Sequence, residues 1–128
     1  MKLNSIFKSD ANAIWAALEK SNATIEFKPD GTILTANENF LKVMGYSLDE
    51  IRGKRHSLFV DPDYAASPDY AAFWEALRRG EFQSSEYRRV AKGGRDVWIQ
   101  GSYNPVLNSA GKVVKVVKIA VDTTAEKL

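Results

Sequence analysis

The chain contains a single histidine, His56, which lies in the segment GKRHSLFVDPDY together with Ser57, Asp61 and Asp63. A histidine near carboxylates could bind a metal ion, and a histidine near serine and aspartate could form a catalytic triad. One histidine is weak evidence for a metal site, because transition-metal sites gather several nitrogen or sulfur ligands. The segment also lacks the glycine-flanked serine turn of a hydrolase. We therefore predict that the protein is not an enzyme and holds no metal through protein ligands alone.

The composition excludes several other kinds of chemistry. None of the 128 residues is cysteine, which excludes disulfides, cysteine-bound zinc or iron–sulfur clusters, and photoreceptors that form a flavin–cysteine adduct. No phosphate-binding GxxxxGK[ST] loop occurs. The formal net charge of +2 predicts neither nucleic-acid binding nor membrane-surface binding. No apolar run is long enough to span a membrane, so we expect one cytoplasmic domain with a single core.

Apolar residues near the N-terminus recur at helical spacing. Asp10 is predicted to cap a helix that runs to about Lys20. The apolar stripe of this helix contains Ile14, Trp15 and Leu18. Such side chains on a short helix must pack either on their own domain or on a second subunit. The sequence leaves both outcomes open, and these three residues are the candidate interface of a homodimer.

The next segment carries the signals of a hairpin and of two short helices. Ile25 and Phe27 alternate with polar residues before the turn at 29–31, which predicts that two strands pair as a hairpin. Asn37 can cap a short helix that follows. Ser47 and the glutamate three residues later have the spacing of a capping box, which predicts a second short helix.

The second half of the chain predicts one longer helix and three strands. Ser67 suits an N-cap and Pro68 the first position of a helix that Gly80 ends. Alternating runs joined by glycine-containing turns then predict strands across residues 81–121. Hairpin-paired strands with helices between them indicate an α+β fold, in which an antiparallel sheet is covered on one face.

Four segments together resemble a PAS domain: PDGTILTANENFLKVMGYSLDEIRGK, YAAFWEALRRGEF, RRVAKGGRDVWIQGSYNPV and VVKVVKIAVDTTAEK. The first and third are similar to the PAS copies of soluble bacterial methyl-accepting chemotaxis receptors. The resemblance implies a five-stranded antiparallel sheet with short helices on one face, preceded by an amphipathic helix. We expect an N-terminal cap helix over 1–22, the sensory domain over 23–122, and at 123–128 the start of a connector to a C-terminal signalling domain.

The resemblance also implies a function. A PAS input domain of a chemoreceptor detects redox state, oxygen or a small molecule in a pocket and relays the change to a signalling domain. Asp122 and Thr124 match the family's Asp-x-Thr signature at the exit of the last strand. A short acid there could bond to the backbone and set the direction of the next segment. The alternative is a ligand-free PAS module for dimerisation or protein–protein interaction.

The resemblance is sharpest to the flavin-binding PAS domain of bacterial aerotaxis receptors, which implies FAD as the cofactor. The match rests on an asparagine before the first short helix, a histidine after the short helices and a tryptophan on the longer helix. The candidate cofactor-binding residues are Asn37, His56, Phe73, Trp74 and Trp98.

Two features keep other ligand states open. Val60 and Asp61 precede Pro62, where that family has an arginine before a histidine–proline pair, and such an arginine could pair with flavin phosphates. Heme b is the second candidate, because one imidazole suffices as the proximal iron ligand, and His56 would supply it. The third is no cofactor, in which case Trp74 is a core residue and His56 only ties a loop together.

Overall fold

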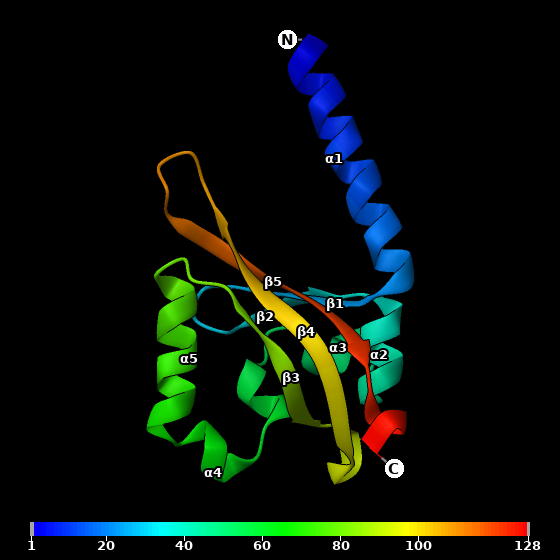
Figure 1. The fold of residues 1–128 in the computed structure, drawn as a ribbon, viewed down its shortest axis with the longest axis vertical. Coiled ribbons are helices and arrows are strands. Elements are labelled where there is room, and N and C mark those ends of the chain that lie inside the picture. The colour runs from blue at the N-terminus through cyan, green and yellow to red at the C-terminus, as the bar shows by residue number, and fades with distance from the viewer. Residues whose placement is uncertain (1, 128) are drawn as a thin grey trace.

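The computed structural model describes the backbone of residues 2–127 and the side chains of residues 9–127. Its strands are β1 (Ala23–Phe27), β2 (Ile33–Ala36), β3 (Gln83–Val90), β4 (Asp96–Leu107) and β5 (Val113–Asp122). They form one antiparallel sheet in the order β2-β1-β5-β4-β3 (Figure 1). The predicted α+β fold with a five-stranded antiparallel sheet is therefore confirmed.

Short helices connect β2 to β3 and cover one face of the sheet (Figure 1). They are α2 (Glu38–Met44), α3 (Leu48–Ile51), the 3-10 helix η1 (His56–Phe59), α4 (Pro62–Ala65) and α5 (Pro68–Arg78). The predicted N-caps are confirmed, because the side chains of Asn37, Ser47 and Ser67 each accept a hydrogen bond from a backbone amide of the following helix. Two further 3-10 turns are η2 (Lys92–Gly94) and η3 (Thr124–Lys127).

The core lies between the sheet and these helices. Side chains on a strand alternate between its two faces, and in β4 the buried residues Val97, Ile99 and Tyr103 share the face toward the helices. In β5 the residues at 116, 118 and 120 face the same way. One face of the sheet is thus packed against helices, and the other carries exposed side chains such as Val121.

The N-terminal helix α1 (Lys2–Ser21) is longer than expected. The prediction that Asp10 caps it is wrong, because the helix already begins at Lys2 and Asp10 lies inside it. No glycine or proline occurs between residues 2 and 21 to interrupt the helix before Asp10. The helix extends away from the sheet (Figure 1), and Ile14 and Leu18 are 54% and 41% exposed. The boundaries of the three expected segments stay predictions.

The chain enters and leaves the sheet at the same end of two neighbouring interior strands, β1 and β5. Strand β1 follows α1 directly, and in its pairing with β5 the residue Ala23 lies opposite Ala120. Asn22 at the end of α1 and Asp122 at the end of β5 line one shallow groove. The last turn of α1 and the end of β5 are therefore close in space, while the rest of α1 projects away from η3 (Figure 1).

Candidate functional site

His56 lies at the first position of η1 and is only 1% exposed. Both of its ring nitrogens are hydrogen-bonded to tyrosine hydroxyls. Nδ1 lies 2.7 Å from Oη of Tyr70 in α5, and Nε2 lies 2.8 Å from Oη of Tyr103 in β4. The backbone amide of His56 also donates to the carbonyl of Gly31. His56 thus connects the helical layer, the β1–β2 turn and the centre of the sheet.

The direction of these hydrogen bonds follows from Arg89 in β3. Nε and Nη2 of Arg89 lie 3.3 and 3.0 Å from Oη of Tyr103, and a guanidinium can only donate. The hydroxyl hydrogen of Tyr103 is therefore free to donate to Nε2 of His56. A neutral imidazole then carries its proton on Nδ1 and donates it to Tyr70. Burial, and next the positive charges of Arg89 and Lys118, hold the pKa of His56 well below its usual value.

Aromatic rings surround the His56 imidazole on several sides. The Phe73 ring stacks on it with centroids 6.2 Å apart, and the rings of Phe27 and Trp74 meet it edge to face at 5.3 and 5.4 Å. The Phe73 ring in turn meets the Tyr103 ring edge to face, with centroids 4.8 Å apart. Three of the predicted cofactor-binding residues, His56, Phe73 and Trp74, are thus brought together, in a closely packed cluster.

The other two predicted cofactor residues lie elsewhere. Oδ1 of Asn37 accepts hydrogen bonds from the backbone amides of Thr24 and Phe40, each at 3.0 Å. Its Nδ2 donates to the carbonyls of Glu19 and Asn22 at 3.0 and 2.9 Å. All of these bonds tie the end of α1 to β1 and α2, so Asn37 has a structural role here and does not join the His56 cluster.

Trp98 lies on the opposite face of the sheet from the cluster. Its neighbours Val97 and Ile99 face the core, so Trp98 points away from it. The ammonium group of Lys127 lies 5.0 Å from the Trp98 ring. A ligand held between the sheet and the helices is therefore separated from Trp98 by the sheet itself.

Replacing Asn37 with alanine is expected to lower the free energy of unfolding by about 2–3 kcal/mol. A lost helix cap costs about 1 kcal/mol, and the change also removes the bonds from Asn37 to α1 and β1. Chemical denaturation measures the difference. Asn12→Ala, on an exposed position of α1, is the matched control, and an equal effect of the two changes would contradict this role for Asn37.

Two buried cations face the core beside Tyr103. Lys118 in β5 and Arg89 in β3 are 2% and 4% exposed. The Lys118 ammonium lies 4.7 Å from the Tyr103 ring centroid, and the Arg89 guanidinium lies 4.6 Å from that of Tyr87. Within residues 9–127 neither forms an ion pair with a carboxylate. Burial, followed by repulsion from Arg89, holds the pKa of Lys118 well below its usual value.

Sequence reasoning missed these cations and both tyrosine partners of His56. The signal for Lys118 is its inward register in VVKVVKIAV, where it shares a face with Val116 and Ala120. For Arg89 the signal is the shared face with Tyr87 in β3. Both signals become readable only once the inward face of each strand is known.

A groove of about 330 Å³ opens beside the cluster, and we call it the His56 groove. Its volume is at the lower end of the range of small-ligand pockets, about 300–1,000 Å³. Its lining includes aromatic, hydroxyl and charged groups: Asp30, Gly31, Arg55, His56, Ser57, Ala65, Tyr70, Ala71, Trp74 and Arg78. Aromatic rings suit a flat ring system, and arginines suit phosphates. This set of side chains fits a flavin by its chemistry. Arg55 and Arg78 supply cations for its phosphates, although the chain lacks the family's arginine near Val60.

Heme ligation by His56 does not fit the same geometry. An iron ligand needs a ring nitrogen with a free lone pair, and Nε2 is already occupied by the Tyr103 hydroxyl at 2.8 Å. Nδ1 faces Tyr70 at 2.7 Å. In this arrangement neither ring nitrogen of His56 is free to bind iron, and heme binding stays a prediction.

The predicted relay residues form a compact exit from the sheet. Oδ1 of Asp122 accepts from the backbone amide of Thr124 at 2.9 Å, as expected for an acid that sets the direction of the chain. Oγ1 of Thr124 accepts from the backbone amide of Trp98 at 2.9 Å, and the amide of Thr123 donates to the Trp98 carbonyl at 2.8 Å. The exit is thereby attached to β4, the strand that carries Tyr103.

Comparison with known proteins identifies the class. The family model described as PAS fold matches residues 33–120, and the chain belongs to this family. A light-oxygen-voltage domain whose mechanism was studied with a flavin analogue has a similar structure, with a TM-score of 0.74 at 22% identity over 90% of this chain and 87% of that one. At this identity the similarity concerns the fold.

Two curated relatives are similar to this chain in sequence. The biofilm dispersion protein BdlA of Pseudomonas aeruginosa is 51% identical over 110 residues, which are 86% of this chain and 26% of that protein. The aerotaxis receptor of Escherichia coli is 29% identical over 75% of this chain and 19% of the receptor. The chain thus spans about a quarter or less of the length of these relatives. It is a PAS sensory domain homologous to theirs.

One further property concerns membranes. Among residues 2–127, none of the helices combines the length and the apolar character that crossing a bilayer requires.

Proposed function

We propose that this domain is the sensory input of a cytoplasmic chemoreceptor-type protein and binds a flavin in the His56 groove. The observation that carries the proposal is the position of His56, which lines the groove and is bonded to Tyr103 in the central sheet. A flavin supplies a ring system whose charge changes on reduction. His56, Tyr70 and Trp74 would contact that ring system, and Arg55 and Arg78 would pair with its phosphates.

The same contacts provide a route from the groove to the exit. If the proton on Nδ1 of His56 moves, Nε2 changes between accepting a hydrogen bond from the Tyr103 hydroxyl and donating one to it. Tyr103 belongs to β4, and the Trp98 backbone of that strand holds Thr123 and Thr124. We propose that Asp122 and Thr124 pass the change to a C-terminal signalling domain, and that the domain binds and relays without catalysing a reaction.

Flavin binding is tested by reconstitution. Purified protein is incubated with excess FAD and passed over a gel-filtration column, and retained flavin is measured from the visible spectrum. Flavin is expected to co-elute with the protein, and Arg78→Ala is expected to weaken its retention about tenfold. Arg79→Ala is the matched control, because Arg79 is the next residue, pairs with Glu81 and does not line the groove. A folded protein that retains no flavin would contradict the proposal.

A second function, ligand-free dimerisation, is favoured by one observation. Ile14 and Leu18 expose apolar side chains on a helix that projects from the domain. Apolar side chains of this kind are often covered by a partner, and Trp15 adjoins them. If Trp15→Ala leaves the mass measured by light scattering unchanged, this helix does not form the interface of a homodimer.

A further inference from the structure

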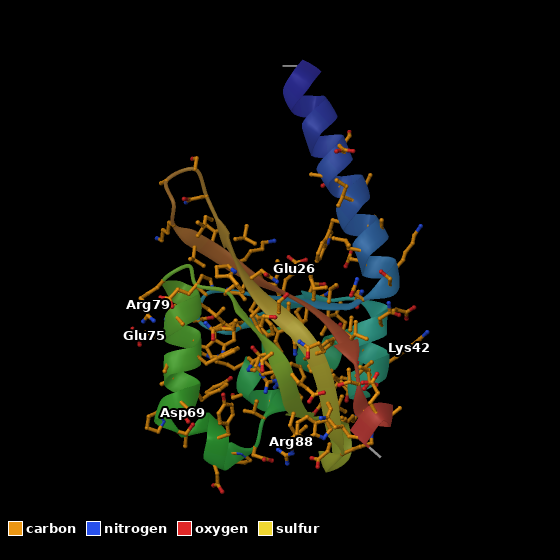
Figure 2. The ribbon with its side chains drawn as sticks, viewed as in Figure 1. Glu26, Lys42, Asp69, Glu75, Arg79 and Arg88 are labelled. Carbon is orange, nitrogen blue, oxygen red and sulfur yellow. The ribbon has the colours of Figure 1, made fainter. Side chains whose placement is uncertain are left out.

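A second groove, on the other side of the cluster, has a buried arginine in its lining. Its volume is about 340 Å³, and its lining residues are Val60, Asp61, Tyr64, Glu86, Tyr87, Arg88 and Arg89. We call it the Arg89 groove. It lies where the η1–α4 segment faces β3, near Arg88 in Figure 2. It shares no lining residue with the His56 groove.

The charges at the rim of this groove are already paired. Arg88 forms ion pairs with Asp61 at 2.6 Å and with Asp96 at 3.1 Å. Glu86 pairs with Lys127 at 2.6 Å. Arg89 is the exception, because no carboxylate of the described side chains pairs with it.

The hydrogen bonds of Arg89 leave part of its guanidinium available. Nε and Nη2 donate to Oη of Tyr103, and Nη1 donates to the carbonyl of Arg88 at 3.0 Å. These bonds use three of the five N–H hydrogens of a guanidinium. One hydrogen on each of Nη1 and Nη2 has no acceptor within residues 9–127. Two such hydrogens can form a bidentate pair with a carboxylate.

A buried cation without a counterion is costly, because burial removes its hydration. A carboxylate that enters the groove would supply the missing charge and accept the two N–H bonds. The other walls of the groove are Val60, which is buried, and the rings of Tyr64 and Tyr87. These walls suit an apolar or aromatic body attached to the carboxylate.

We propose that the Arg89 groove binds a small carboxylate with an aromatic or apolar body, with Arg89 as its charge partner. This site is separate from the proposed flavin site and does not depend on it. Because Arg89 also donates to Tyr103, which bonds to His56, a carboxylate on the two remaining hydrogens would offset the guanidinium charge that the Tyr103 hydroxyl faces. The ligand would thereby act on the hydrogen-bond chain that ends at Tyr70 in the His56 groove.

The test uses benzoate and its neutral analogue benzamide. Each is titrated into ¹⁵N-labelled protein, and binding is followed from amide chemical shifts. Benzoate is expected to shift the amides of Val60, Tyr64 and Tyr87 and to bind about 10- to 100-fold more tightly than benzamide, as a lost charge-assisted pair predicts. Equal affinities, no binding of benzoate, or shifts confined to Ser57 and Ala71 in the His56 groove would overturn the proposal.

Variants then assign the effect to Arg89. Arg89→Gln, checked for folding by circular dichroism, is expected to abolish the preference for benzoate. Arg79→Gln removes an equal charge from the end of α5, away from Arg88 and the groove (Figure 2), and is expected to keep the preference. A preference that persists in Arg89→Gln would overturn the proposal. If Arg89→Gln does not fold, the comparison of benzoate with benzamide on the unaltered protein still decides.

Discussion

His56→Ala is expected to lower the free energy of unfolding by about 3–4 kcal/mol. The change leaves a cavity between the rings of Phe27, Phe73 and Trp74, and truncation of a buried ring typically costs about 3–5 kcal/mol. It also removes the acceptor of the Tyr103 hydroxyl, which is fully buried. Urea denaturation of the two proteins measures the difference.

The matched control for His56→Ala is Leu58→Ala in the same 3-10 helix. Leu58 is 38% exposed, so its truncation is expected to cost less than about 1 kcal/mol. Similar losses from both changes would show that the effect belongs to the helix and not to the His56 cluster.

The pH dependence of stability gives an independent measurement of His56. Its folded-state pKa is depressed, so below about pH 6.5 the unfolded chain binds a proton that the folded chain does not. The contribution of His56 to the free energy of unfolding is complete above that pH and is lost as the pH falls toward the folded-state pKa. His56 is the only histidine. The difference in stability between the protein and His56→Ala is therefore expected to shrink between pH 7 and pH 5.

Lys118→Met is expected to raise the free energy of unfolding by about 2 kcal/mol at pH 7. The lysine is buried without an ion pair within the described side chains, and each unit by which burial depresses its pKa costs about 1.4 kcal/mol. Methionine has a similar length and carries no charge, so it can fill the same space against Tyr103 and Phe40. Thermal and urea denaturation measure the gain.

The pH dependence of the stability gain distinguishes an effect of the Lys118 charge from an effect of its packing. Below the ordinary pKa of 10.5, the unfolded chain holds the proton on this lysine while the folded chain disfavours it. The cost is therefore largest near neutral pH and disappears as the pH approaches 10.5. A gain for Lys118→Met that stays constant from pH 7 to pH 10 would contradict a charge effect.

Lys115→Met provides the control on the same strand. Lys115 points to the other face of the sheet and pairs with Glu26 at 2.8 Å. A surface ion pair of this kind contributes about 0–1 kcal/mol. Lys115→Met is thus expected to leave stability unchanged or to lower it slightly, with no gain at neutral pH.

The elements that the sequence predicted correctly depend on local signals. The caps at Asn37, Ser47 and Ser67 and the turn at 29–31 are defined by residues within a few positions of each other. Asp10 shows the limit of such signals. An acidic residue suits a helix N-terminus, but it does not start a helix where the residues before it can also be helical.

The candidate site was predicted less completely, because its contacts join distant parts of the chain. His56 and Tyr103 are 47 positions apart, and their contact depends on the register of β4. The prediction for Trp98 assumed that its ring faces the ligand side, and the alternation of the strand places it on the other face. The family resemblance singled out His56, Phe73 and Trp74 as candidate cofactor residues, but their polar partners required the fold.

The pairing of Ala23 with Ala120 affects how a conformational change in the sheet can reach the segments that flank it. The ends of α1 and β5 lie beside each other, so a shift within the sheet changes the distance between the two flanking segments very little. A twist of β5 relative to β1 instead changes the angle between α1 and η3. Cross-links between the two flanks should therefore be nearly insensitive to ligand, while their relative orientation should respond to it.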